Sequence, residues 1–166
     1  MAKKRKMPDM NLPVWFEGQN INEALFCEEF LQERRIIFAN RAFFTPNGRV
    51  TDDIVLRGEV YEKLKSYTIS SVPQKIKNIM ELLKLEAMVE DLPPQPDRLH
   101  VANGTLMLDG RFIEGKQEIV QSRLPVSYNP DASAPALWLN FLDGLLYPED
   151  IPTLQEFIGY CLIPSN

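Results

Sequence analysis

The chain has 166 residues, of which 45% are hydrophobic and 25% are charged, and its formal net charge is −5. This is ordinary globular usage, and the length is sufficient for one domain with a real core and a small appended part. No apolar run reaches the roughly 18 residues of a membrane span, and the basic start lacks the apolar centre of a secretory signal, so both are excluded.

The charge is unevenly distributed along the chain. Residues 1–90 hold 14 Lys/Arg and 13 Asp/Glu, whereas residues 91–166 hold 4 and 10. Nucleic-acid-binding proteins usually present a basic face, so any such face is expected in the first half. Residues 1–19 are expected to be a basic flexible tail, either a solubilising terminus or a phosphate contact; its charged residues are Lys3, Lys4, Arg5 and Lys6.

Residues 20–92 are expected to form a helical part with a small hairpin. Helices are predicted over 20–34, with Asn20 as the capping residue, over 53–67, and from a Ser71 cap onward. Two strands, 36–39 and 42–45, are expected to join at Asn40-Arg41. The neighbouring aromatic side chains are either a stacking platform for single-stranded nucleic acid or part of the core; they are Phe38, Phe43 and Phe44, with Arg41 and Arg49 beside them.

The proline-rich connector 92–96 marks the best boundary, and residues 97–166 are expected to form a β-meander followed by two C-terminal helices. Asn103-Gly104 and Asp109-Gly110 are strong turn signals between short apolar runs. A fourth strand is expected over 118–123. A helix from Pro135 is expected to have a strongly apolar face, formed by Leu137, Trp138, Phe141, Leu142 and Leu145. A last helix is expected over 151–162, with its apolar residues inward; these are Leu154, Phe157, Ile158 and Cys161. The predicted fold class is α+β, with helices flanking small antiparallel hairpins and meanders.

The sequence contains no recognisable catalytic constellation. It lacks a phosphate-binding loop, a dinucleotide fingerprint and a nucleophile elbow. His100 is the single histidine and is expected to have a structural or surface role in a strand. Asp52-Asp53 and Glu149-Asp150 could bind Mg²⁺, but helix capping is the stronger reading for both pairs. Cys27 and Cys161 are expected to be small buried residues, and no structural metal is expected.

Three segments occur together in an order typical of one protein family. They are NGTLML from Asn103, RLPVSYNPDA from Arg123, and FIGYCL from Phe157, with a Trp138-containing helix before the last. Together they resemble the phage and plasmid primase-helicase family, shared with the poxvirus primase-helicase. In that family the pattern belongs to the N-terminal, pre-helicase domain that precedes a superfamily 3 helicase domain of the AAA+ type. The resemblance is good over 99–162 and looser over 38–90.

The resemblance implies a non-catalytic domain that supports assembly and engages DNA in a replicative helicase of a phage or mobile element. The residues that match family positions are expected to be structural or to lie at an interface; they are Asn103, Gly104, Arg123, Tyr128, Trp138, Gly159 and Tyr160. ATP and Mg²⁺ would be bound by a helicase domain missing from this chain, and the parent protein would be the ATP-dependent enzyme. The chain itself is expected to carry no catalytic, cofactor or metal residue.

The expected partners are DNA and other copies in the parent hexamer, with no membrane, in the cytoplasm of a bacterial host or phage-infected cell. The weaker DNA-binding candidates are Lys3, Lys4, Arg5, Lys6, Arg41 and Arg49. Two alternatives stay open. One is a stand-alone nucleic-acid-binding adaptor that uses the basic tail, and the other is a small enzyme with a site around Asp52, Asp53 or His100.

Overall fold

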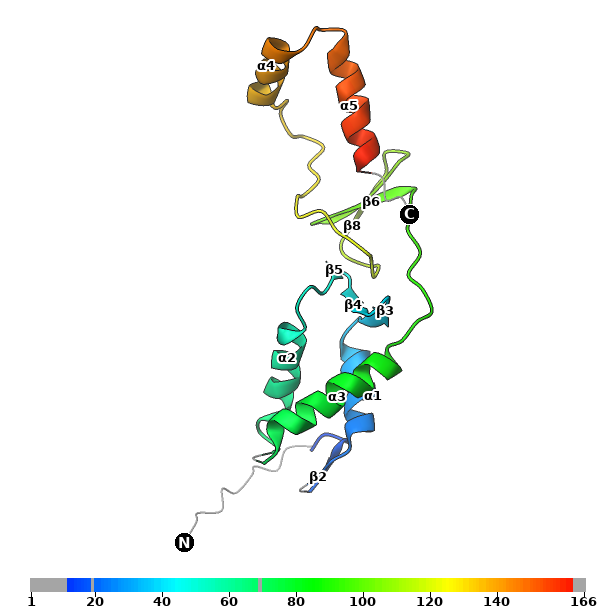
Figure 1. Cartoon of the computed structure of the whole chain (residues 1–166), viewed down its shortest axis with the longest axis vertical. Coiled ribbons are helices and arrows are strands. Elements are labelled where there is room, and N and C mark those ends of the chain that lie inside the picture. Colours follow the sequence, from blue (N-terminus) through cyan, green and yellow to red (C-terminus); the bar gives the residue numbers. More distant parts are fainter. Residues whose placement is uncertain (1–11, 19, 69, 163–166) are drawn as a thin grey trace. The chain divides into compact units, whose positions relative to one another are not determined.

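The computed structural model describes residues 12–162 except 19 and 69, and the chain divides into two compact units (Figure 1). The first comprises the described residues up to 43 together with 50–89, and the second comprises 44–49 and the described residues from 90 onward. The described residues form five helices and three small antiparallel sheets, so the predicted α+β fold is confirmed. The domain boundaries predicted from the sequence stay a prediction.

Three helices build the first unit: α1 (Glu23–Glu33), α2 (Ile54–Leu64) and α3 (Val72–Glu86). The predicted start of α1 at Asn20 is wrong, because Asn20 pairs with Glu17 in the short β1–β2 hairpin (Phe16–Glu17 and Asn20–Ile21). The Asn22 side chain caps α1 instead, accepting a hydrogen bond from the Leu25 amide at 3.2 Å. Ser71 does precede α3, but its backbone is left-handed (φ 55°) and its side chain makes no capping bond.

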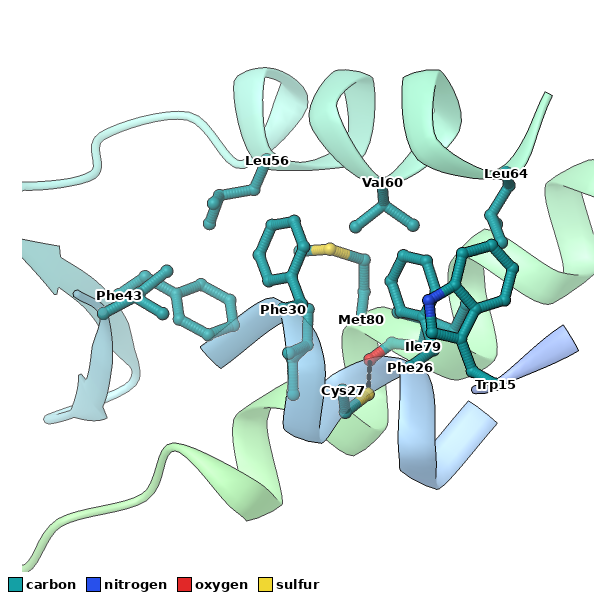
Figure 2. Close-up of a cluster of buried hydrophobic side chains, with 12 residues drawn as sticks. Trp15, Phe26, Cys27, Phe30, Phe43, Leu56, Val60, Leu64, Ile79 and Met80 are labelled. Carbon is teal, nitrogen blue, oxygen red and sulfur yellow. Dashed lines mark hydrogen bonds between the residues drawn. The ribbon is translucent and has the colours of Figure 1, made fainter. Parts of the chain in front are cut away.

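The core of the first unit lies where α3 packs against both α1 and α2 (Figure 2). Trp15 meets Phe26 edge to face, with ring centroids 5.0 Å apart. The Cys27 thiol donates to the Ile79 carbonyl oxygen at 3.7 Å, the dashed line in Figure 2. Burial, with the charges of Glu86 and Glu23, raises the pKa of this thiol to about 12, so Cys27 is an unreactive core residue as expected.

A three-stranded sheet follows α1, with β3 (Ile37–Ala39), β4 (Ala42–Thr45) and β5 (Gly48–Arg49) in that order. The predicted turn at Asn40-Arg41 is confirmed, and both residues have positive φ, at 47° and 63°. This is the geometry of a type I′ hairpin turn. Backbone bonds from the Phe38 amide to the Ala87 carbonyl oxygen (2.7 Å) and from the Val89 amide to the Phe38 carbonyl oxygen (3.0 Å) fix β3 to the end of α3.

The sheet of the second unit is the predicted meander of β6 (Arg98–Val101), β7 (Gly104–Met107) and β8 (Phe112–Glu114). The expected fourth strand over 118–123 is wrong, because the chain there is irregular and its side chains bond to other segments. The backbone reaches β6 just beyond it. The Leu124 amide donates to the His100 carbonyl oxygen (2.8 Å), and the Ala102 amide donates to the Val126 carbonyl oxygen (2.9 Å).

Two helices, α4 (Ala136–Leu145) and α5 (Asp150–Cys161), complete the second unit. Their positions match the prediction, but the expected inward direction of the apolar residues of α5 is wrong. Leu142 is the one buried residue of α4 and α5 has none, while the remaining apolar residues are largely exposed, Cys161 among them. A periodic pattern shows which side chains avoid water but not what covers them. Among the described helices, none combines the length and hydropathy that crossing a bilayer requires.

Candidate functional site

His100 is buried in β6 between two side-chain partners. Its Nδ1 lies 3.0 Å from the Thr105 hydroxyl and its Nε2 lies 2.5 Å from the Gln95 amide oxygen. The Gln95 amide nitrogen donates to Glu118 at 3.0 Å, which fixes the orientation of the amide. These partners assign the proton to Nε2, with Nδ1 accepting from Thr105. Burial and then the charge of Arg123 lower the pKa of His100, so the ring is neutral and structural.

The hollow beside His100 is too small for a substrate. It is lined by the proline-rich connector and by the irregular segment, with Gln95 and Val120 among its walls, and its volume is about 30 Å³. That is room for about two or three water molecules. This hollow therefore does not support the alternative of an enzyme site at His100.

The paired carboxylates lie where helices begin. Asp52 Oδ1 accepts the Ile54 amide at 2.9 Å at the start of α2. Asp53 forms an ion pair with Arg57 at 2.9 Å, and this hydrogen bond lowers the pKa of Asp53. Among the described residues, no group of three or more His, Cys, Asp or Glu gathers as metal ligands would. The sequence also lacks a phosphate-binding loop.

Arg123 joins three separate backbone segments of the second unit. Its Nε donates to the Pro46 carbonyl oxygen at 2.7 Å, and its Nη1 donates to the carbonyl oxygens of Val101 (2.6 Å) and Gly104 (2.7 Å). Burial lowers the pKa of Arg123, yet a guanidinium remains charged in proteins. Its second terminal nitrogen is buried without a partner in the described part of the chain. Arg123 thus ties the backbone at Pro46, Val101 and Gly104 together through Nε and Nη1.

The Asn103-Gly104 turn is held against the segment that follows Arg123. The Asn103 side chain makes two hydrogen bonds of 2.9 Å with the backbone of Tyr128. The Tyr128 ring lies over Phe112, with centroids 5.1 Å apart. At Gly104 a Cβ atom would lie 2.2 Å from the Ile113 carbonyl oxygen, so the position accepts no side chain. The Asn103-Gly104 turn thus meets Phe112, Ile113 and Tyr128 in one cluster of the second unit.

These cluster residues lie within a stretch that matches a family model. The model, described as D5 N terminal like, matches residues 39–146, which is most of the chain. The chain belongs to this family. This family is the pre-helicase domain of the primase-helicases, so the resemblance seen in the sequence is confirmed. No curated protein matches the chain.

The family match does not cover every residue that the motifs singled out. Trp138 lies inside the matched range, on α4 of this D5 N-terminal-like domain, with its ring stacked on Phe141 at 5.6 Å. Gly159 and Tyr160 lie beyond it, on α5. Both Trp138 and Tyr160 are exposed. Their assignment to an interface stays a prediction.

The arginine candidates for DNA binding are exposed, but the aromatic platform beside them is not available. Arg41 lies at the turn between β3 and β4, and Arg49 ends β5. Phe43 and Phe44 are buried, and Phe38 packs edge to face on Phe43 with centroids 4.9 Å apart. Bases could not stack on buried rings, so the platform hypothesis is wrong. The basic residues Lys3, Lys4, Arg5 and Lys6 lie outside the described residues.

The sequence did not reveal the polar group around Glu118. Its carboxylate receives Arg98 Nη1 at 3.0 Å and the Gln95 amide at 3.0 Å, which connects it to His100. Partners some 20 residues apart in irregular chain leave no periodic signal. His100 and its neighbour Val101 are both buried.

Proposed function

We propose that this chain is a non-catalytic domain of a replicative DNA helicase of a phage or mobile element, where it supports assembly and engages DNA. Its membership of the D5 N-terminal-like family supports the replication context. The observation that carries the assembly role is the apolar surface of α4, where Leu137, Phe141 and Leu145 are all more than half exposed. Exposed faces of this kind mark interaction sites in stable proteins.

The DNA-engaging part of the proposal rests on the first half of the chain. Arg41 and Arg49 are exposed and form no ion pair within the described residues, so their charges are available to phosphates. The basic residues 3–6 add four charges to the same half. In this proposal the helicase domain of the parent protein binds ATP and Mg²⁺ and supplies the motor, other copies are the assembly partners, and the site of action is the cytoplasm of a bacterial or phage-infected cell.

Two measurements test the proposal. Sedimentation of the full-length protein should show a large assembly that falls apart in a Leu137→Ser, Phe141→Ser variant, whereas Ile113→Ser, an exposed change in the β-meander, should leave it intact. Anisotropy of a labelled single-stranded oligonucleotide should show salt-dependent binding that weakens when Arg41 and Arg49 become Gln.

A full-length assembly unaffected by the double serine variant would contradict the assembly role. Absence of DNA binding at low salt would contradict the DNA role. DNA binding that depends on residues 3–6 alone, in a protein that never assembles, would instead favour a stand-alone nucleic-acid-binding adaptor.

A further inference from the structure

The outer face of α4 is apolar and uncovered. Leu137, Phe141 and Leu145 recur every four residues and are 88%, 55% and 63% exposed, with Trp138 beside them. Residues spaced in this way lie on one side of a helix. Leu142, on the adjoining side, is the one buried residue of α4. Helices at protein surfaces usually turn charged and polar residues outward, so this face is built to be covered.

The second helix of the pair has the same character. No residue of α5 is buried, and Phe157 and Tyr160 are 63% and 71% exposed. With Ile158 they place three large apolar or aromatic side chains on a helix of twelve residues. The described chain supplies no cover for them.

Two glycines within these helices support an external partner. A Cβ atom added at Gly144 or Gly159 would meet nothing within 4 Å, and neither residue has a positive φ. Each therefore makes its helix less stable than alanine would, without a packing or conformational reason within the described chain. Missing side chains on a helix surface allow another backbone to approach closely.

The charge of this region restricts what the partner is. After Arg123 the chain contains no lysine, arginine or histidine, and it contains five carboxylates: Asp131, Asp143, Glu149, Asp150 and Glu156. All five are exposed, and none is ion-paired within the described residues. Phosphates of DNA and anionic lipid headgroups would be repelled. The same face of a second copy would bring carboxylates against carboxylates.

We propose that the apolar faces of α4 and α5 dock an amphipathic protein helix whose apolar side is flanked by lysine and arginine. The inference rests on the assembly role proposed above and specifies the chemistry of the partner. Leucine-type side chains would cover Leu137, Phe141 and Phe157, and the flanking cations would meet Glu156, which lies next to Phe157 on α5. Helix-in-groove recognition combines these two contributions, with burial giving affinity and charge giving selection.

Two synthetic helical peptides test the proposal on the full chain. One has leucine on one face and lysine on the other, and the second has glutamate in place of every lysine. Binding is read from the indole NMR signals. Trp138 on α4 should shift, whereas Trp15, buried in the first unit, should not. The lysine peptide should bind at least about tenfold more tightly than the glutamate peptide.

Matched variants separate the two contributions. Leu137→Ser with Phe141→Ser removes apolar contact at constant charge, and Glu156→Gln removes charge at nearly constant shape. Both variants should weaken lysine-peptide binding, whereas Asp143→Asn, on the opposite side of α4 from Phe141, should not. Gly159→Ala should stabilise the free chain and weaken binding.

Two results would overturn the proposal: equal binding of both peptides, or a Trp138 shift on adding single-stranded DNA or anionic vesicles. Failure of this proposal can be distinguished from failure of the assembly role. If the double serine variant lost assembly while both peptides bound equally, only the basic character of the partner would be refuted.

Discussion

The side chain of Asn103 pairs with the backbone of Tyr128 as one peptide group pairs with another. Its Nδ2 donates to the Tyr128 carbonyl oxygen and its Oδ1 accepts the Tyr128 amide, both at 2.9 Å. The two residues are 25 positions apart. Asn103 therefore contributes a donor and an acceptor at fixed spacing, and a residue that is merely tolerated in turns would not replace it.

Replacing Asn103 by Asp should destabilise the second unit. The substitution removes the donor and sets a carboxylate against the Tyr128 carbonyl oxygen, at a cost of about 1–3 kcal/mol. Amide hydrogen exchange of β6 and β7 measures this locally, which matters because two units need not unfold together. Tyr128→Phe is the control, since it keeps the backbone and the ring contact with Phe112. An equal loss of stability in both variants would contradict the prediction, because Tyr128→Phe keeps both hydrogen bonds of Asn103.

Gly104→Ala should be among the most damaging single changes in the second unit. The added Cβ atom would lie 2.2 Å from the Ile113 carbonyl oxygen and 2.6 Å from the Phe112 ring, so β8 would have to move away from β7. A loss of at least about 3 kcal/mol is expected, measured by urea unfolding. Gly115→Ala, where the Cβ atom would meet nothing but φ is 88°, should cost about 1–2 kcal/mol. Equal losses of stability in the two variants would mean that β8 moves away from β7 at little cost in free energy.

Arg123→Lys should weaken the second unit although the charge is retained. One ammonium group cannot reproduce the fork that reaches Pro46, Val101 and Gly104, and a buried carbonyl oxygen left unpaired costs about 1–3 kcal/mol. Arg111→Lys is the matched control. Arg111 pairs with Asp109 at an exposed site, where such a pair contributes about 0–1 kcal/mol. Similar small losses in both variants would show that charge alone matters at Arg123.

Local signals in the sequence were sufficient for most elements. The Asn40-Arg41 and Asn103-Gly104 turns, the meander and all five helices were predicted, because turn chemistry and periodicity act within a few residues. The start of α1 was misplaced because Asn20 and Asn22 are equally good capping residues, and the β1–β2 pairing decides between them.

The long-range features were not predictable in the same way. The segment 118–123 has strand-like composition, but Arg123 and Glu118 bond to distant groups, and the chain there follows those bonds instead of a ladder. The apolar side chains of α5 were predicted to face inward but are exposed. Hydrophobicity shows that a side chain favours burial, but not whether the residues that bury it belong to the same chain. The partners of Arg123 lie up to 77 residues away, beyond any local pattern.

Acid should destabilise the second unit through His100. Its pKa in the folded chain lies below the ordinary value of 6.5, because of burial and Arg123, with Arg98 adding to the shift and Glu118 and Asp97 opposing it. As pH falls below 6.5 the unfolded chain takes up a proton that the folded chain does not, so stability declines until the folded pKa is passed. The His100 Cε1 proton shift followed against pH should give a midpoint below 6.5. A midpoint above 6.5 would mean that Glu118 outweighs burial.

Gly58→Ala should stabilise the first unit. Gly58 lies within α2, its φ is not positive, and a Cβ atom there would meet nothing within 4 Å. Alanine therefore adds no clash and restricts the unfolded chain, a gain of about 0.4–1 kcal/mol measured by hydrogen exchange of α2 and α3. Gly18→Ala is the control in the same unit, since its site is equally open but φ is 72°, and it should destabilise. A loss of stability in Gly58→Ala would show that α2 needs the freedom of glycine for a reason other than space.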